Sequence, residues 1–78
     1  MEGKIKELFA TILNINEKDI NGETSPQKIE NWDSMQHLIL VSGFEEEFKI
    51  NIEPEEAIEM YKDFNTFKTI VIQKLNGS

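Results

Sequence analysis

The sequence predicts an all-α fold, a four-helix bundle with a long loop between the first two helices and a short third helix. Apolar residues recur at steps of three and four along most of the chain, a spacing that places them on one face of a helix. No segment shows the alternation of apolar and polar residues that is typical of a strand. The 78 residues fit one domain, residues 1–78, and leave no room for a second.

The first predicted helix is followed by a loop that is long for so small a domain. Five apolar residues at helical spacing form the buried face of this helix: Ile5, Leu8, Phe9, Ile12 and Ile15. Helix-breaking residues then dominate up to residue 31, namely Asn14, Asn16, Asn21-Gly22, Thr24-Ser25-Pro26 and Asn31. We expect the apolar side chains of Ile20, Ile29 and Trp32 to anchor the loop on the core.

The second helix has the clearest start signal in the chain. Asp33 is suited to be its N-cap, and Gln36, three residues later, completes a capping box. A buried stripe follows at helical spacing, made of His37, Val41, Phe44 and Phe48 and flanked by Leu38 and Leu40. The other side of the helix collects Met35, Ile39, Ser42 and Glu46. Gly43 leaves room for the close approach of another element.

Two shorter segments complete the predicted bundle. Asn51 and Pro54 separate the second helix from a short third one. The residues of the third helix predicted to pack inward are Ala57, Ile58 and Tyr61. Asn65 or Thr66 is expected to cap the fourth helix. The buried residues of this last helix are predicted to be Phe67, Ile70, Val71 and Leu75.

Charge and composition exclude several classes of function. Eight Lys and no Arg stand against 15 Asp and Glu, which gives a net charge of −7. Such a chain repels nucleic acids and anionic membranes, so we expect protein partners with basic patches. The absence of Cys excludes disulfides and thiolate metal sites. With no signal peptide and no run near the roughly 18 apolar residues of a membrane span, the sequence predicts a cytoplasmic monomer.

The residues that could support catalysis or metal binding are few. His37 lies one helical turn after Ser34, but no third member of a catalytic triad accompanies them, so the sequence predicts a core histidine and no enzyme. The segment Glu17–Gly22 spaces oxygen ligands like the start of a calcium-binding loop. Its twelfth position, which should supply a bidentate Glu, is Lys28. The sequence therefore predicts no dedicated metal site.

Ser34 is the residue whose position is most suggestive of function. It lies in the first turn of the second predicted helix, directly after the acidic cap, where its hydroxyl should be exposed. Free backbone N–H groups and the positive end of the helix dipole favour a phosphate at this place. These considerations leave two interpretations open, an ordinary first-turn serine and a site of modification by a phosphate-bearing group.

The motif around Ser34 resembles that of the acyl carrier proteins, the family of phosphopantetheine-binding carriers. The matching residues are Trp32-Asp33-Ser34-Met35, Leu38, Val41, Phe44-Glu45-Glu46-Glu47-Phe48 and Ile52. In that family an Asp-Ser-Leu motif opens the second helix, which runs into a Glu-rich stretch ending in Phe. The similarity continues through Pro54-Glu55-Glu56-Ala57 and Asn65-Thr66-Phe67 and covers nearly the whole chain.

The resemblance implies a function for Ser34. In the family this serine carries 4′-phosphopantetheine, delivered from coenzyme A by a phosphopantetheinyl transferase (a holo-acyl-carrier-protein synthase). The adjacent Asp, here Asp33, assists recognition by that enzyme. Acyl intermediates are then carried as thioesters between acyl-loading and acyl-transferring enzymes, and the carrier itself catalyses nothing.

Departures from the family's pattern indicate a docking surface of mixed character. Met35 replaces the usual Leu, a change of similar bulk that should leave modification intact. Gln36 and Ile39 occupy positions that are acidic in typical fatty-acid carriers. We expect partner enzymes with basic or mixed surfaces to dock on Asp33, Met35, Ile39 and Glu46. The alternative is that the loop or the third helix covers Ile39.

The sequence leaves the cargo open. Fatty-acid, polyketide, peptidyl and cell-wall alanylation pathways all use similar carriers, and the strong acidity argues mildly for an acyl over a peptidyl or aminoacyl cargo. A different class of function is an acidic helical adaptor that binds a basic partner and is never modified. Ser34 separates these classes, because an adaptor should tolerate its loss and a carrier should not.

Overall fold

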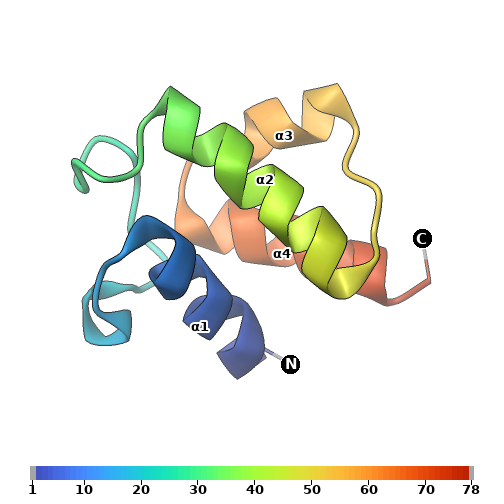
Figure 1. The fold of residues 1–78 in the computed structure, drawn as a ribbon, viewed down its shortest axis with the longest axis horizontal. Helices are drawn as coiled ribbons and strands as arrows, with labels where there is room; N and C mark the ends of the chain where they lie inside the picture. The colour runs from blue at the N-terminus through green and yellow to red at the C-terminus, as the bar shows by residue number, and fades with distance from the viewer. Residues whose placement is uncertain (1, 78) are drawn as a thin grey trace.

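Four α-helices and one short 3-10 helix make up the ordered elements of the computed structural model, which describes residues 2–77 (Figure 1). In chain order they are α1 (Glu2–Leu13), the 3-10 helix η1 (Glu17–Asp19), α2 (Ser34–Phe48), α3 (Pro54–Met60) and α4 (Phe64–Leu75). These described residues include no strand, so the predicted all-α fold is confirmed. α2 crosses α4, with α1 and α3 on opposite sides of this pair (Figure 1).

The helices pack around a cluster of aromatic rings. Phe9 of α1 lies at its centre, with ring centroids 5.0 Å from Trp32, 4.8 Å from Phe64 and 5.2 Å from Phe67. All three pairs are edge-to-face, the arrangement that the ring quadrupole favours, and each adds about 0.5–1.5 kcal/mol to simple burial. Phe44 of α2 joins from the other side of Phe67, at 4.8 Å. The cluster therefore connects α1, α2, α4 and the end of the long loop.

Two apolar residues lie outside the core that the periodicity predicted. Leu40 is fully buried whereas Leu38 is exposed, because the buried positions follow His37 at i+3, i+4 and i+7. On α3, Ile58 was expected to face inward and is exposed, while Met60 is fully buried. α3 has only seven residues, and its few apolar side chains do not define one face. Which of them is buried therefore depends on how α3 packs on the rest of the fold.

The start of α4 differs from the expected one. Neither Asn65 nor Thr66 is the cap: Asp63 is, and its carboxylate accepts a hydrogen bond of 2.8 Å from the backbone N–H of Thr66. That bond, and then one with the Thr66 side chain, lower the pKa of Asp63. The helix begins earlier because Phe64 must lie inside the ring cluster, and a cap has to precede it.

The long loop is a packed connector that supplies the ends of two helices. Ile20 and Trp32 are buried and Ile29 is half-buried, which confirms the predicted anchors. The carbonyl of Thr24 accepts a 2.7 Å hydrogen bond from the N–H of Phe64, at the start of α4. The side-chain amide of Asn31 donates to the carbonyl of Leu13, at the end of α1, over 2.9 Å. Both helix ends thereby satisfy backbone groups that helices leave unpaired.

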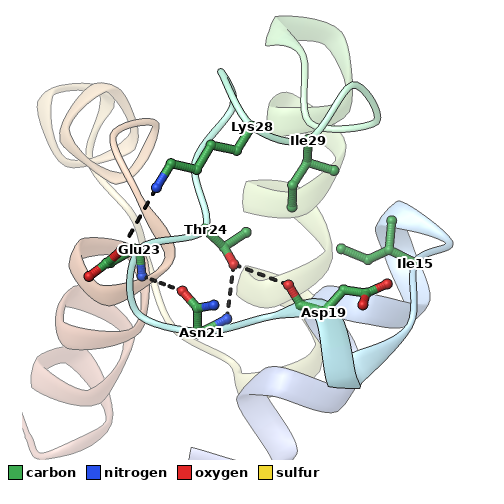
Figure 2. A pocket seen from close by; sticks show the side chains of 7 residues that line it. All are labelled: Ile15, Asp19, Asn21, Glu23, Thr24, Lys28 and Ile29. Carbon is green, nitrogen blue, oxygen red and sulfur yellow. Dashed lines mark hydrogen bonds and ion pairs between the residues drawn. The ribbon is translucent and has the colours of Figure 1, made fainter.

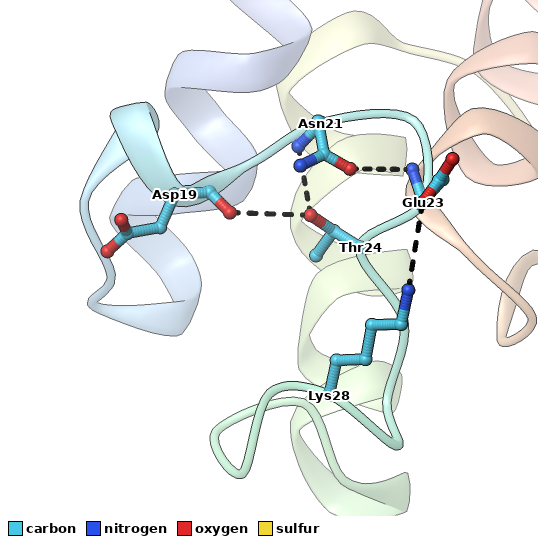
Figure 3. A network of polar contacts seen from close by, with 5 residues as sticks. All are labelled: Asp19, Asn21, Glu23, Thr24 and Lys28. Carbon is cyan, nitrogen blue, oxygen red and sulfur yellow. Dashed lines mark hydrogen bonds and ion pairs between the residues drawn. The ribbon is translucent and has the colours of Figure 1, made fainter.

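A local network shapes the middle of this loop (Figure 3). The Thr24 hydroxyl accepts from the N–H of Asn21 at 2.9 Å and lies 3.4 Å from the carbonyl of Asp19. The Asn21 side chain accepts from the N–H of Glu23 at 2.8 Å, the geometry of an Asx turn. Lys28 approaches Glu23 at 3.9 Å, an exposed pair that contributes little.

Gly43 sits where α1 crosses α2. A Cβ atom at this position would lie 2.8 Å from Cδ1 of Ile12, well inside van der Waals contact. The close approach predicted from this glycine is therefore confirmed, and the side chain of Ile12 is the group that uses the space.

The C-cap of α2 offers a test of backbone strain. Lys49 has the left-handed conformation, φ 55°, while its N–H closes the helix on the carbonyl of Glu45. Because glycine adopts this conformation without the Cβ penalty, Lys49→Gly should raise the free energy of unfolding by about 1 kcal/mol in urea titrations. Lys6→Gly, in the interior of α1, removes the same charge and should lower it by a similar amount. Destabilisation by both changes would contradict the assignment of strain.

Candidate functional site

Ser34 is the first residue of α2, and its side chain is exposed. Asp33 precedes it in extended conformation and accepts a 2.8 Å hydrogen bond from the N–H of Gln36, which confirms the predicted N-cap. The reciprocal bond of a capping box, from the Gln36 side chain to the backbone of Asp33, is not formed within residues 2–77. The cap fixes the first turn of α2 and leaves the Ser34 hydroxyl accessible.

Large apolar side chains are exposed around this serine. The four in the described chain are Met35 (70% exposed), Leu38 (69%), Ile39 (49%) and Ile58 (76%). Three of them lie within the five residues that follow Ser34. Ile39 is half exposed, so the alternative that the loop or α3 covers it is wrong. Ser42 and Glu46, which share its face of α2, are exposed as well.

An apolar cleft of about 410 Å³ opens between α2 and α3 beside Ser34. Its lining residues are Ser34, His37, Leu38, Pro54, Ala57, Ile58 and Tyr61. The lining includes Ile58, which the sequence pattern placed inward, and Leu38, which was predicted to flank the buried stripe of α2.

His37 is buried at the base of the first turn of α2, and both of its ring nitrogens are engaged. Nδ1 accepts a hydrogen bond of 3.0 Å from the indole N–H of Trp32. Nε2 lies 2.7 Å from the carbonyl of Ala57 and donates to it. Burial lowers the pKa of the ring, with the bond to Ala57 opposing the shift. No ring nitrogen is left to deprotonate Ser34, so the predicted core histidine is confirmed.

The Glu-rich segments divide into structural and exposed residues. Glu45 accepts a 2.8 Å bond from the N–H of Ile52, and Glu56 pairs with Lys74 of α4 at 2.8 Å. The hydrogen bond from Lys74 is the main reason that the pKa of Glu56 is lowered. The exposed carboxylates on α2 and α3 are those of Glu46, Glu47, Glu55 and Glu59. These four carboxylates therefore contribute to the acidic surface of the two helices.

A second pocket, of about 370 Å³, lies in the loop (Figure 2). The lining includes Ile15, Ile29 and the polar residues of the network in Figure 3. These polar side chains bond to one another and to the loop backbone. Residues 2–77 hold no cluster of three His, Asp or Glu side chains that could bind a metal, and none of their helices is long and apolar enough to cross a membrane. The pocket is best understood as a by-product of the folded loop.

The arrangement of helices is that of a known protein. A solution NMR structure of a holo acyl carrier protein from Geobacter metallireducens matches this structure with a TM-score of 0.83 at 24% sequence identity. The match covers 96% of this chain and 85% of the other. The chain has the acyl carrier fold. The resemblance drawn from the motif around Ser34 is thus confirmed in the fold, although the sequence matches no protein-family model and no curated protein.

Two equivalent caps of this acyl carrier fold can be compared directly. Asp33 and Asp63 each accept a 2.8 Å bond from the N–H three residues later. We predict that Asp33→Ala and Asp63→Ala each lower the free energy of unfolding by about 1 kcal/mol in urea titrations. An unchanged stability of the Asp33→Ala protein would contradict the role of Asp33 as a cap.

Proposed function

We propose that this protein carries acyl groups as thioesters on a 4′-phosphopantetheine arm attached to Ser34. The observation that carries the proposal is the exposed hydroxyl of Ser34 on the first residue of α2, behind the Asp33 cap, in a chain with the acyl carrier fold. When bound, the arm supplies a thiol, a group that this cysteine-free chain lacks.

The backbone around Ser34 fits a phosphodiester. The first hydrogen bond within α2 runs from the N–H of His37 to the carbonyl of Asp33, and the Asp33 side chain takes the N–H of Gln36. The N–H groups of Ser34 and Met35 precede both bonds and lie at the positive end of the helix dipole. They favour negative charge next to the Ser34 oxygen.

Ser34 supplies the nucleophilic oxygen for its own modification, and the nearby histidine is not available as its base. Both nitrogens of His37 are occupied, and Asp33 uses one carboxylate oxygen as the helix cap. We expect the transferase to supply the magnesium ion and most of the chemistry of this step. Asp33 contributes by holding the first turn and by presenting a carboxylate beside the hydroxyl.

The exposed face of α2 is suited to dock the enzymes that load and unload the carrier. Met35 and Ile39 provide apolar contacts close to Ser34, and Glu46 provides negative charge two turns beyond Ile39. A partner with an apolar centre and a basic rim matches this pattern, in keeping with the net charge of −7. The apolar lining of the cleft favours an acyl cargo over an aminoacyl one.

Modification of Ser34 is tested by intact mass. After incubation with coenzyme A, magnesium and a broad-specificity phosphopantetheinyl transferase, the chain should gain one phosphopantetheine, and Ser34→Ala should gain none. Thr69→Ala, which removes an exposed hydroxyl of α4 away from α2, is the matched control and should be modified like the wild type. Modification of Ser34→Ala would contradict the assignment. No modification of the wild type by an active transferase would favour the adaptor.

Docking on α2 is tested by a change of charge at Ile39. Ile39→Glu should lower the transferase's kcat/KM for the carrier by roughly tenfold, equal to about 1.4 kcal/mol, because an apolar contact is replaced by a carboxylate. Thr69→Glu adds the same charge on an exposed part of α4 and should leave the value unchanged. Equal values for both variants and the wild type would show that Ile39 does not contact the enzyme.

A further inference from the structure

The only histidine and the only tryptophan of the chain are hydrogen-bonded to each other. The indole N–H of Trp32 can only donate, so Nδ1 of His37 must be unprotonated, and the ring proton lies on Nε2. From there it is donated to the carbonyl of Ala57, 2.7 Å away. Trp32 is 1% exposed and His37 is 5% exposed, so the bond between the two rings is shielded from water, and the bond to Ala57 is partly buried. The ring is thus fixed in one neutral tautomer.

This hydrogen-bond chain joins three segments, two of which, α2 and α3, have few other backbone contacts with each other. Trp32 ends the long loop, His37 lies in α2, and Ala57 lies in the middle of α3. The backbone of α3 packs closely on α4 but approaches α2 at few points. Between α2 and α3 lies the apolar cleft, whose lining includes Ser34, His37 and Ala57. The bond from His37 to Ala57 is therefore a direct polar link across the floor of the cleft beside Ser34.

We infer that His37 is a positioning residue, which fastens the Ser34 end of α2 to α3 through the Trp32–His37–Ala57 hydrogen-bond chain and does so only while its ring is neutral. The consequence for the loading of Ser34 rests on the proposed function. The hydrogen-bond chain itself belongs to the unmodified protein.

Protonation of the ring is incompatible with this geometry. A proton on Nδ1 would face the indole N–H across 3.0 Å, two donors without an acceptor, in a buried site. The groups that face the ring are Trp32 from the loop, the Ala57 carbonyl of α3, Tyr61 at the end of α3 (centroids 4.8 Å apart) and Phe67 of α4 (6.2 Å). None of these groups carries a carboxylate or an ammonium group that could pair with a charged ring. On α2, the carboxylate of Asp33 lies one turn earlier and caps the helix.

The sign of the pH dependence follows from this environment. Burial lowers the pKa of His37 below its ordinary value of 6.5, so the unfolded chain binds the proton more readily than the folded one. The contribution of neutral His37 to the free energy of unfolding is fully present above pH 6.5. It is lost as the pH falls from 6.5 toward the lower pKa that His37 has in the folded chain. Over that range the unfolding equilibrium constant rises by up to about tenfold per pH unit.

The single indole N–H resonance of Trp32 makes the test simple. In ¹H–¹⁵N spectra of the unmodified protein between about pH 7.5 and 5.5, we expect this resonance to move together with the imidazole of His37, at a midpoint below 6.5. His37→Gln offers an acceptor to Trp32 and a donor to Ala57 without titrating, so its indole resonance should stay in place. Titration of the imidazole at 6.5 or above, or titration that leaves the indole unmoved, would overturn the inference.

A loading assay separates positioning from stability. With coenzyme A and the transferase, the loading rate of the wild type relative to His37→Gln should fall as the pH is lowered over the same range. His37→Leu, which lacks both bonds, should raise the KM for the carrier at every pH, and Gln should restore it. If the ratio of the wild-type loading rate to that of His37→Gln does not change with pH, the positioning role is overturned. A wild type that is not loaded at about pH 7.5 would overturn the proposed function instead, while the spectra still decide the hydrogen-bond chain.

Discussion

The burial of Trp32 is the constraint on which the position of Ser34 depends. Its ring lies edge-on to Phe9 at 5.0 Å and to Phe67 at 6.3 Å, so the end of the long loop is fixed to α1 and α4 together. The next residue, Asp33, caps α2, and Ser34 follows as the first helical residue. A hydroxyl on a helix terminus is therefore held in place by the side chain of Trp32, two residues away, which is buried in the core.

The rest of the long loop also fixes the ends of helices, here those of α1 and α4. Its carbonyl at Thr24 accepts from the first N–H of α4, and its Asn31 side chain closes the end of α1. Its polar network and its pocket (Figures 2 and 3) belong to this structural role. The proposed functional site lies elsewhere, on α2 and α3. There Leu38 and Ile58 line an apolar cleft beside the accessible hydroxyl of Ser34, and Met35 and Ile39 are exposed on α2 nearby.

Local sequence signals predicted the parts of the structure that depend on local interactions. The cap at Asp33, the exposed position of Ser34 and the buried stripe from His37 to Phe44 follow from residue types three and four positions apart. The exposure of Ile58 and the cap at Asp63 were not predictable, since both depend on where α3 and Phe64 pack. The bond from His37 to Ala57 joins residues 20 positions apart, so no local pattern could have indicated it.

The most direct test of the central claim, that function resides beside Ser34 on α2, compares ¹H–¹⁵N spectra of the chain before and after treatment with coenzyme A and transferase. We predict that the largest changes in chemical shift fall at Ser34 and Met35 and along the cleft, at Leu38 and Ala57. The loop pocket around Asn21 and Thr24 should stay unchanged. Changes concentrated in the loop pocket would contradict the claim.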